Sequence, residues 1–353
     1  MRWQQQELTA DDPEALPGLG RLAGLVRSVR TPEFAGVTFH EVRCRSALNR
    51  VPGSSPMPFG WTINPYRGCT HGCRYCFARR SHEYLEFDSG MDFDTQIVVK
   101  TNIGAVLRRE VTRPGWRREH VAMGTNTDPY QRAEGRYALM PEIIRALADS
   151  GTPFSILTKG TVLSRDLPLL AAATASVPVG IGVSLALLDP ALQESLEPGT
   201  PSPAARLKLI HRITEAGLPC GVLIAPVLPY LTDSEQQLTA LVAAIRDAGA
   251  TGISGFALHL RPGAREWFLR WLTECRPDLV PRYRRLYVGG SNLRRELRAE
   301  LSGRIRRICD RLGMGSYGQE FRDMPHGAES AGPPGTPPAG GAPAGPECQA
   351  TLF

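Results

Sequence analysis

The sequence predicts an α/β protein whose core is a partial (β/α)6 barrel of parallel strands, with an N-terminal extension and a C-terminal basic helix. Six apolar runs of strand length alternate along the chain with six helical patterns. The runs are continuously apolar rather than alternating, which is typical of parallel strands covered by helices. Successive strand–helix units wrap with right-handed connections, so six in a row predict an open or partial barrel.

Each expected element has its own signal in the sequence. The expected strands are 61–63, 120–123, 154–157, 177–185, 220–227 and 252–260. The expected helices are 103–111, 141–150, 166–173, 204–216, 234–248 and 265–274. Gly151, Gly217 and Gly249 follow three of these helices, at positions where glycine commonly ends a helix.

The chain outside the barrel differs in composition from the core. We expect four parts: an N-terminal extension (1–57), the core (58–276), a C-terminal helical extension (277–323) and a Pro/Gly/Ala-rich tail (324–353). Within the extension, 22–29 is expected to be a short helix and 36–44 a strand. The tail has almost no apolar bulk, so we expect it to be disordered.

Length and composition limit the class of protein. With 353 residues, of which 42% are hydrophobic, the chain can bury one large core. It has no apolar signal core at its start and no apolar run of membrane-spanning length, so we expect a cytoplasmic protein. The eight cysteines should then remain reduced, and metal binding is a better use for them than disulfides.

Cys69, Cys73 and Cys76 stand close together in a loop directly after the first expected strand. Thiolates bind soft or borderline metals, so the candidates are an iron–sulfur cluster and zinc. A closed zinc site or an ordinary four-iron cluster uses four protein ligands. Three neighbouring cysteines therefore favour a cluster with one iron open to another ligand.

Other interpretations of this loop are weaker. A redox dithiol of Cys73 and Cys76 would leave the first cysteine without a role, and a haem attachment site needs histidine where Phe77 stands. A zinc site that recruits His71 or His82 as its fourth ligand is the main alternative. The remaining cysteines are scattered, and we expect them to be small buried or incidental residues: Cys44, Cys220, Cys275, Cys309 and Cys348.

Polar residues follow most of the expected strands at their carboxyl ends. They are Gly124-Thr125-Asn126 and Asp128 after the second strand, Lys159 after the third, Ser184 in the fourth, Ala225-Pro226 in the fifth, and His259 and Arg261 in the sixth. Chemistry in barrels and open α/β sheets gathers at these ends. We therefore expect a polar pocket above the metal site.

The chain resembles the radical S-adenosyl-L-methionine (SAM) superfamily. The resemblance is carried by the cysteine loop, which has Tyr75 before its last cysteine, and by the six βα units that contain it. The resemblance covers roughly residues 58–275. Within the superfamily it is closest to the spore photoproduct lyase-like branch, also called DNA repair photolyase-like. That lyase-like resemblance is carried by Lys159, the segment from Ser184 through Glu197-Pro-Gly-Thr to Arg206, and Ala225-Pro226.

The resemblance implies two cofactors and an electron donor. Cys69, Cys73 and Cys76 would hold three irons of a [4Fe-4S] cluster, and the fourth iron would bind the amino and carboxylate groups of SAM. Reductive cleavage of SAM would give methionine and a 5′-deoxyadenosyl radical that abstracts hydrogen from a substrate. A flavodoxin- or ferredoxin-like protein would supply the electron.

The resemblance also implies which residues contact SAM. Gly124, Thr125 and Asn126 would lie at its amino group, Lys159 at its carboxylate, Ser184 near the cofactor and Tyr75 by the adenine. A cation such as Lys159 suits a carboxylate. Spore photoproduct lyases carry a hydrogen-donating cysteine near the second strand end, whereas this chain has Gly124-Thr125. The resemblance therefore extends to the cofactor chemistry and not to the repair reaction.

The positive charge of the chain is concentrated near the C-terminus. The formal net charge is +6, and the segment from Arg282 to Arg311 contains ten arginines against three acidic residues. A localised basic stripe suits a polyanion. Leucines and isoleucines recur there at helical spacing, so the arginines of an amphipathic helix could equally face only water.

The sequence supports one leading hypothesis and two alternatives. The leading hypothesis is a radical SAM enzyme acting on a nucleic-acid or other macromolecular substrate, with the Arg282 to Arg311 segment as the nucleic-acid contact. One alternative is a zinc-stabilised nucleic-acid-binding protein without catalysis. The other is a radical SAM enzyme acting on a small metabolite or peptide.

Overall fold

We describe the fold from a computed structural model, in which residues 6–8, 22, 24–52 and 57–317 are described. The expected tail, 324–353, lies outside these residues. The strands belong to two sheets, one of eight strands and one of five. No helix among the described residues has both the length and the apolar character needed to cross a membrane.

The eight-stranded sheet forms the predicted partial barrel. Its strands are β4 (Leu48–Arg50), β5 (Trp61–Ile63), β8 (Val121–Met123), β9 (Phe154–Thr158), β10 (Val179–Ser184), β11 (Cys220–Val227), β12 (Gly252–Ala257) and β13 (Gly315–Ser316). The strand order is β13-β12-β11-β10-β9-β8-β5-β4, and every pair from β5 to β13 is parallel. All six expected strands are present, which confirms the predicted fold class.

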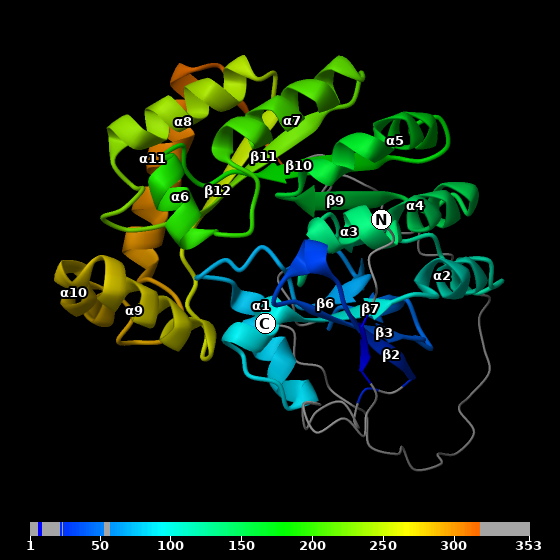
Figure 1. The fold of residues 1–353 in the computed structure, drawn as a ribbon. Coiled ribbons are helices and arrows are strands. Elements are labelled where there is room, and N and C mark those ends of the chain that lie inside the picture. The colour runs from blue at the N-terminus through cyan, green and yellow to red at the C-terminus, as the bar shows by residue number, and fades with distance from the viewer. Residues whose placement is uncertain (1–5, 9–21, 23, 53–56, 318–353) are drawn as a thin grey trace, which may run out of the picture.

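Helices cover the outer face of this sheet (Figure 1). Those in the expected positions are α2 (Ile103–Val111), α4 (Met140–Asp149), α5 (Leu167–Ala173), α7 (Pro203–Glu215), α8 (Glu235–Asp247) and α9 (Ala264–Cys275). Gly151, Gly217 and Gly249 have positive φ angles of 70°, 76° and 90°, so they end α4, α7 and α8 as predicted. The expected basic helix is α11 (Arg295–Arg311), which packs on β12 and α8.

Shorter helices connect these elements. They are α1 (Met91–Thr95), α3 (Arg132–Tyr137), α6 (Pro190–Leu196), α10 (Val280–Leu286) and the 3-10 segments η2 (Pro32–Phe34), η3 (Phe77–Leu85), η4 (Thr161–Asp166) and η5 (Pro277–Leu279). The cysteine loop leads directly into η3.

The two faces of the barrel sheet carry different residues. Ile181 and Val183 of β10 point outward and are buried under helices, while Gly182 and Ser184 alternate with them on the inner face. Gly182 pairs in register with Gly221 of β11. A Cβ atom at Gly221 would lie 1.7 Å from the Tyr317 ring, so this tyrosine fills the inner face just below the level of Ser184.

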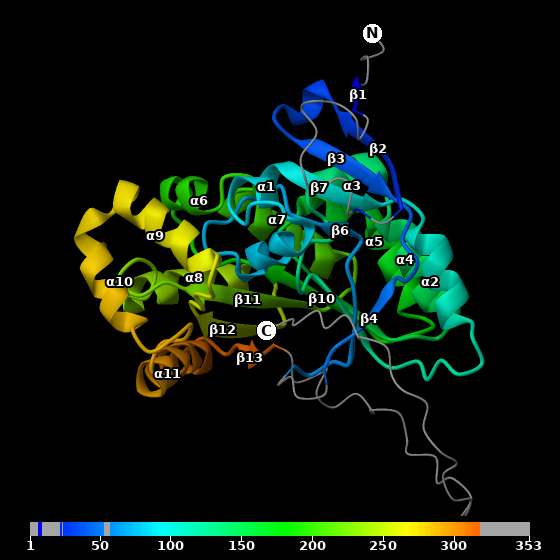
Figure 2. The same cartoon turned by 90° about the horizontal axis from the view of Figure 1, so that it is seen from below.

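The five-stranded sheet joins the N-terminal residues to the core. Its order is β1 (Gln6–Leu8), β2 (Leu25–Arg30), β3 (Thr38–Val42), β7 (Gln96–Lys100) and β6 (Tyr66–Arg67). Figures 1 and 2 show β2 and β3 on the opposite side of the molecule from α11. Because β6 directly precedes the cysteine loop, this sheet anchors the start of the loop.

The expected helix at 22–29 is wrong, whereas the expected strand at 36–44 is confirmed as β3. Residues Leu25–Arg30 form β2, which pairs with β1 on one side and β3 on the other. An isolated helix of eight residues is marginal in water. Pairing on both edges satisfies the backbone hydrogen bonds of β2 and buries Val29 completely. This pairing depends on other strands, so the local sequence of 22–29 does not predict it.

Candidate metal and cofactor site

The cysteine loop is compact, and its three cysteines are largely withdrawn from solvent. Cys69 and Cys73 are each 8% exposed, and Cys76 is half-buried. Gly68 and Gly72 have φ angles of +79° and +60°, a left-handed conformation that favours glycine. These two turns curl the backbone around the thiols.

Burial controls the ionisation of these thiols. It raises the pKa of Cys73 well above its usual value, and raises the pKa of Cys76 to about 11 against the opposing charge of Arg79. Cys73 and Cys76 are therefore neutral in the metal-free protein. A metal would bind by displacing their protons, as thiolate ligands require.

The two histidines of the zinc alternative already have partners. His82 donates a hydrogen bond from Nε2 to the carbonyl oxygen of Gln96 at 2.9 Å, and its ring packs against Phe93. His71 places Nδ1 at 3.3 Å from a carboxylate oxygen of Asp128. Among the described residues, no three His, Cys, Asp or Glu side chains converge closely enough to hold a single metal ion.

The end of β8 supports the cysteine loop from one side. Thr127 donates its hydroxyl to the carbonyl of Gly68 at 2.7 Å, and the Gln131 amide donates to the same oxygen at 3.1 Å. The Gln131 carbonyl oxygen accepts from the backbone N–H of Thr70 at 2.8 Å. These bonds satisfy loop backbone groups that secondary structure does not pair.

The Glu-Pro-Gly-Thr turn after α6 supports the loop from the other side. The backbone N–H of Gly199 donates to His71 O at 3.0 Å, and Arg74 N donates to Leu196 O at 2.9 Å. A Cβ atom at Gly199 would lie 1.9 Å from Thr70 O. Only glycine therefore permits this close approach of the two backbones.

Lys159, Ser184 and Tyr75 come together beside the loop. The Lys159 ammonium donates to the Ser184 hydroxyl at 2.6 Å and lies 5.8 Å from the centre of the Tyr75 ring. The lysine side chain is only 13% exposed, so its charge is weakly screened by water. Three of the residues expected at SAM are therefore in mutual contact.

Glu197 is the centre of this group, and sequence reasoning gave it no role beyond membership of a motif. It is completely buried. Its Oε1 accepts a hydrogen bond from the Tyr75 hydroxyl and lies 3.5 Å from Lys159 Nζ. Its Oε2 accepts a hydrogen bond from Arg206 at 2.5 Å. Burial alone would raise its pKa, but Lys159, Arg206 and Tyr75 outweigh it and lower the pKa to about 2. Arg206 also donates to Ser184 O at 3.1 Å. A charged carboxylate thus positions the lysine.

Asp128 is occupied within the protein. Its oxygens accept from the Lys159 N–H at 2.7 Å and from the Thr158 hydroxyl at 2.5 Å, besides contacting His71. Burial would raise the pKa of Asp128, but His71 and these donors lower it. Asp128 therefore ties the β9 end to the cysteine loop.

Gly124, Thr125 and Asn126 are half-exposed at the end of β8. Gly124 has a φ of +90°, and a Cβ atom there would lie 1.9 Å from Leu157 O. Glycine is therefore required for the chain to turn over β9. Within the described residues, the side chains of Thr125 and Asn126 make no hydrogen bond, so both can serve a ligand.

Comparisons with known proteins identify the family of this chain. The family model of the radical SAM superfamily matches residues 63–242. "Uncharacterized protein Rv2578c" of Mycobacterium tuberculosis is 60% identical over 309 residues, which cover 86% of this chain and 91% of the relative. "Uncharacterized protein ORF301" of Acidianus two-tailed virus is 27% identical over 210 residues, covering 57% of this chain and 68% of the relative.

The fold is similar to that of spore photoproduct lyase. Its complex with dinucleoside spore photoproduct superposes with a TM-score of 0.59 at 17% identity, covering 79% of this chain and 80% of that one. A variant with bound AdoMet (SAM) and the same dinucleoside gives 0.58 at 16% identity, covering 78% and 79%. The cysteine loop, the parallel barrel and the family match agree, and the chain belongs to the radical SAM superfamily of enzymes.

Proposed function

We propose that this protein reductively cleaves SAM at a [4Fe-4S] cluster bound by Cys69, Cys73 and Cys76, and that the reaction acts on a nucleic-acid or other macromolecular substrate. The cluster and SAM together would supply a 5′-deoxyadenosyl radical as the hydrogen-abstracting species. The observation that carries the proposal is the position of the three-thiol loop beside the Lys159–Glu197 group at the strand ends. The family implies both cofactors.

The residues present suit an iron–sulfur cluster. Cys69 and Cys76 pack with Ala78 and Phe93 in a small apolar group, and Cys73 belongs to the main core, which limits access of water to bound sulfide. Three cysteine ligands leave one iron of a four-iron cluster open. The protein's own part is to hold the loop between the β8 end and the Gly199 turn.

The residues around Lys159 suit the amino-acid part of SAM. Lys159 offers a nearly buried ammonium to a carboxylate, and Ser184 adds a hydroxyl beside it. Glu197 holds that ammonium in position, while Tyr75 lies beside it at the proposed adenine side. Thr125 and Asn126 offer oxygens to the amino group, with Gly124 allowing the backbone to come close.

Anaerobic reconstitution tests this chemistry. The protein is loaded with iron and sulfide, reduced with dithionite or a flavodoxin- or ferredoxin-like donor, and given SAM, and 5′-deoxyadenosine is measured. Cys76→Ala should abolish both the cluster and the product. Cys275→Ala, at an exposed thiol, should change neither. Zinc without inorganic sulfide in the purified protein would instead favour the zinc-stabilised binding protein.

The basic surface supports a nucleic-acid substrate. The apolar face of α11 is buried through Leu301, Ile305 and Ile308, and Arg304 and Arg311 pair with acidic residues. The other arginines of the segment are exposed: Arg282, Arg284, Arg285, Arg294, Arg295, Arg298, Arg306 and Arg307.

An aromatic side chain accompanies this charge. Arg282 lies over the ring of Tyr230 at 5.1 Å, and Tyr230 is 49% exposed directly after β11. Exposed aromatic rings beside arginines suit base stacking next to phosphate contacts. We infer that α10, α11 and Tyr230 contact the strand whose base or sugar is presented to the site.

Oligonucleotide binding at several salt concentrations tests the substrate class. If several arginines neutralise phosphates, the logarithm of the binding constant should fall linearly with that of the salt concentration, by about 0.7–0.9 per phosphate contacted. Arg306→Gln combined with Arg307→Gln should reduce this slope. Absent or salt-independent binding would favour a small metabolite or peptide as substrate and would leave SAM cleavage unaffected.

A further inference from the structure

Arg79 and Arg206 are the largest completely buried side chains in the described part of the chain. Arg79 lies three residues after Cys76, in η3. A guanidinium is stable without water only where carbonyl oxygens, carboxylates or aromatic faces replace its hydration. Its partners therefore show how the charge is held.

The contacts of Arg79 converge on one cysteine residue and one carboxylate. Nη2 and Nε donate to the carbonyl oxygen of Cys73 at 2.9 and 3.2 Å. Nη2 also lies 2.9 Å from both carboxylate oxygens of Asp94, and Nη1 donates to Gly90 O at 2.6 Å. The positive charge is thus fixed against the backbone of a proposed cluster ligand, with one carboxylate behind it.

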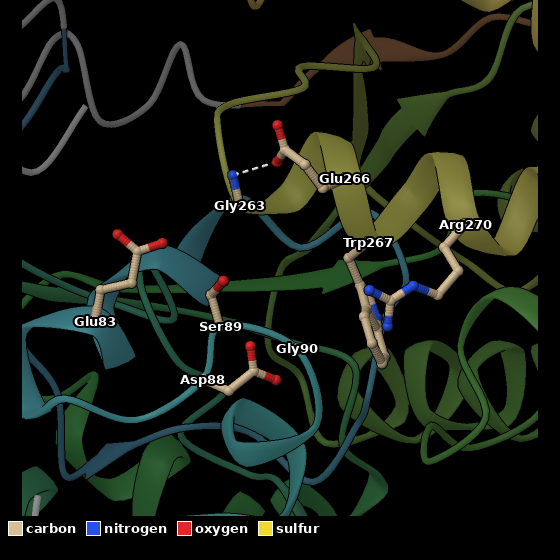
Figure 3. Close-up of a pocket in the computed structure, with 8 residues that line it drawn as sticks. All are labelled: Glu83, Asp88, Ser89, Gly90, Gly263, Glu266, Trp267 and Arg270. Atoms are coloured by element: carbon tan, nitrogen blue, oxygen red, sulfur yellow. Dashed lines mark hydrogen bonds between the residues drawn. The ribbon is translucent and has the colours of Figure 1, made fainter.

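Aromatic rings complete the enclosure. The Arg79 guanidinium lies 5.3 Å from the ring centre of Phe93 and 4.9 Å from that of Trp267. Beyond Trp267 is an open pocket of about 300 Å³, shown in Figure 3, lined by Glu83, Asp88, Ser89, Gly90, Gly263, Glu266, Trp267 and Arg270. The indole and the backbone at Gly90 therefore separate Arg79 from this solvent-filled space.

Arg270 provides an internal comparison. Its guanidinium lies 5.3 Å from the centre of the same indole ring, and Figure 3 shows it beside Trp267 at the pocket. Unlike Arg79, it is exposed. Water and salt screen an exposed charge far more than a buried one, so of these two arginines only Arg79 should act strongly on the cysteine loop.

We propose that the buried Arg79–Asp94 pair sets the reduction potential of the cluster bound by Cys69, Cys73 and Cys76. The inference rests on the proposed function, because it requires that cluster. Reduction adds one electron from the donor to the cluster. The cation of Arg79 stabilises the added negative charge and raises the potential, and the carboxylate of Asp94 lowers it.

Redox titration of the reconstituted protein, without SAM or substrate, tests this assignment. Burial raises the pKa of Asp94 to about 6 despite the pull of Arg79, so the titration is made at pH 8, where the carboxylate is ionised. Midpoint potentials are read from the electron paramagnetic resonance signal of the reduced cluster, in samples matched for iron and sulfide. Arg79→Met should lower the potential, Asp94→Asn should raise it, and the double variant should lie between the two.

Two further variants separate charge from structure. Arg79→Lys keeps the charge and should restore most of the wild-type potential, which a purely structural role of the guanidinium would not predict. Arg270→Met removes an exposed arginine from the same indole and should leave the potential unchanged.

Several results would overturn the proposal. One is an unchanged potential in Arg79→Met at full iron content. Another is a shift of the potential in the same direction in Arg79→Met and Asp94→Asn. A third is a shift in Arg270→Met as large as that in Arg79→Met. If Arg79→Met does not bind iron, Asp94→Asn decides alone, and a lowered or unchanged potential refutes the role. Wild-type protein that binds no iron and sulfide refutes the proposed function instead, before any potential is measured.

Discussion

Glu197→Gln is the most informative single substitution at the candidate site. It keeps the shape of the side chain but replaces one acceptor oxygen with an NH2 donor and removes a charge that faces Lys159, Arg206 and the Tyr75 hydroxyl. Arg206 is itself completely buried. The variant therefore leaves a buried guanidinium without its compensating carboxylate.

The cost of this change follows from the structure in two ways. Removing one partner of a buried ion pair typically costs about 3–5 kcal/mol. Independently, the pKa of Glu197 is lowered from 4.5 to about 2 in the folded protein, which corresponds to about 3 kcal/mol of stability at neutral pH. We expect Glu197→Gln to lower the free energy of unfolding by about 3 kcal/mol.

The pH dependence gives this prediction a sign. Folding lowers the pKa of Glu197 from 4.5 in the unfolded chain to about 2. Its contribution to the free energy of unfolding is therefore fully present above pH 4.5 and is lost as the pH falls toward about 2. The difference in stability between wild type and Glu197→Gln should therefore shrink below pH 4.5. Urea unfolding followed by tryptophan fluorescence between pH 8 and pH 3 measures it.

A matched control uses the same substitution at an exposed carboxylate. Glu215 pairs with His211 at 3.2 Å at the end of α7, and its side chain is 62% exposed. Glu215→Gln should cost no more than about 0.5 kcal/mol. The reasoning is refuted if Glu197→Gln costs no more than this control, or if its deficit stays constant as the pH falls.

Three further predictions concern the loop, the cofactor and the C-terminus. Gly199→Val should displace the cysteine loop and lower the amount of iron bound after reconstitution. Gly115→Val places its side chain in open space and should leave the bound iron unchanged. Equal iron in the two variants would contradict the close backbone approach at Gly199. Lys159→Met should weaken SAM binding, measured by calorimetry, about 10-fold or more while the iron content is unchanged. Lys208→Met, at an exposed lysine, should bind SAM as the wild type does. Unchanged affinity in Lys159→Met would show that this lysine does not contact SAM. A chain ending at Asp323 should retain its full iron content, and a large loss of iron would overturn the expectation that the tail is dispensable for the cluster.

The barrel could be predicted because its signals are local. Each parallel strand is a short apolar run, each helix has its own periodicity, and glycines such as Gly217 and Gly249 mark helix ends. The cysteine loop is equally local, since three thiols within eight residues need no distant partner to come together. These features depend on neighbours in the sequence, so the sequence reveals them.

Strand β2 of the N-terminal sheet could not be predicted from local sequence signals. Whether residues 25–30 become helix or strand depends on β1 and β3 beside them. β3 in turn pairs with β7, whose residues lie far along the chain, as in Thr38 with Gln96. Such pairings are decided by which edges are available in the folded sheet.

The sequence by itself determined the class of protein and singled out the three thiols that we propose as cluster ligands. Only the tertiary structure placed Glu197 beneath Lys159 and Tyr75, and buried Arg79 behind Cys73 with Asp94 as its counter-charge. Tyr75 and Glu197 are 122 residues apart in the chain, and no local spacing encodes their meeting. A buried charge is stable only beside partners that the fold supplies, so the groups that hold and tune this site become visible only once the chain is folded.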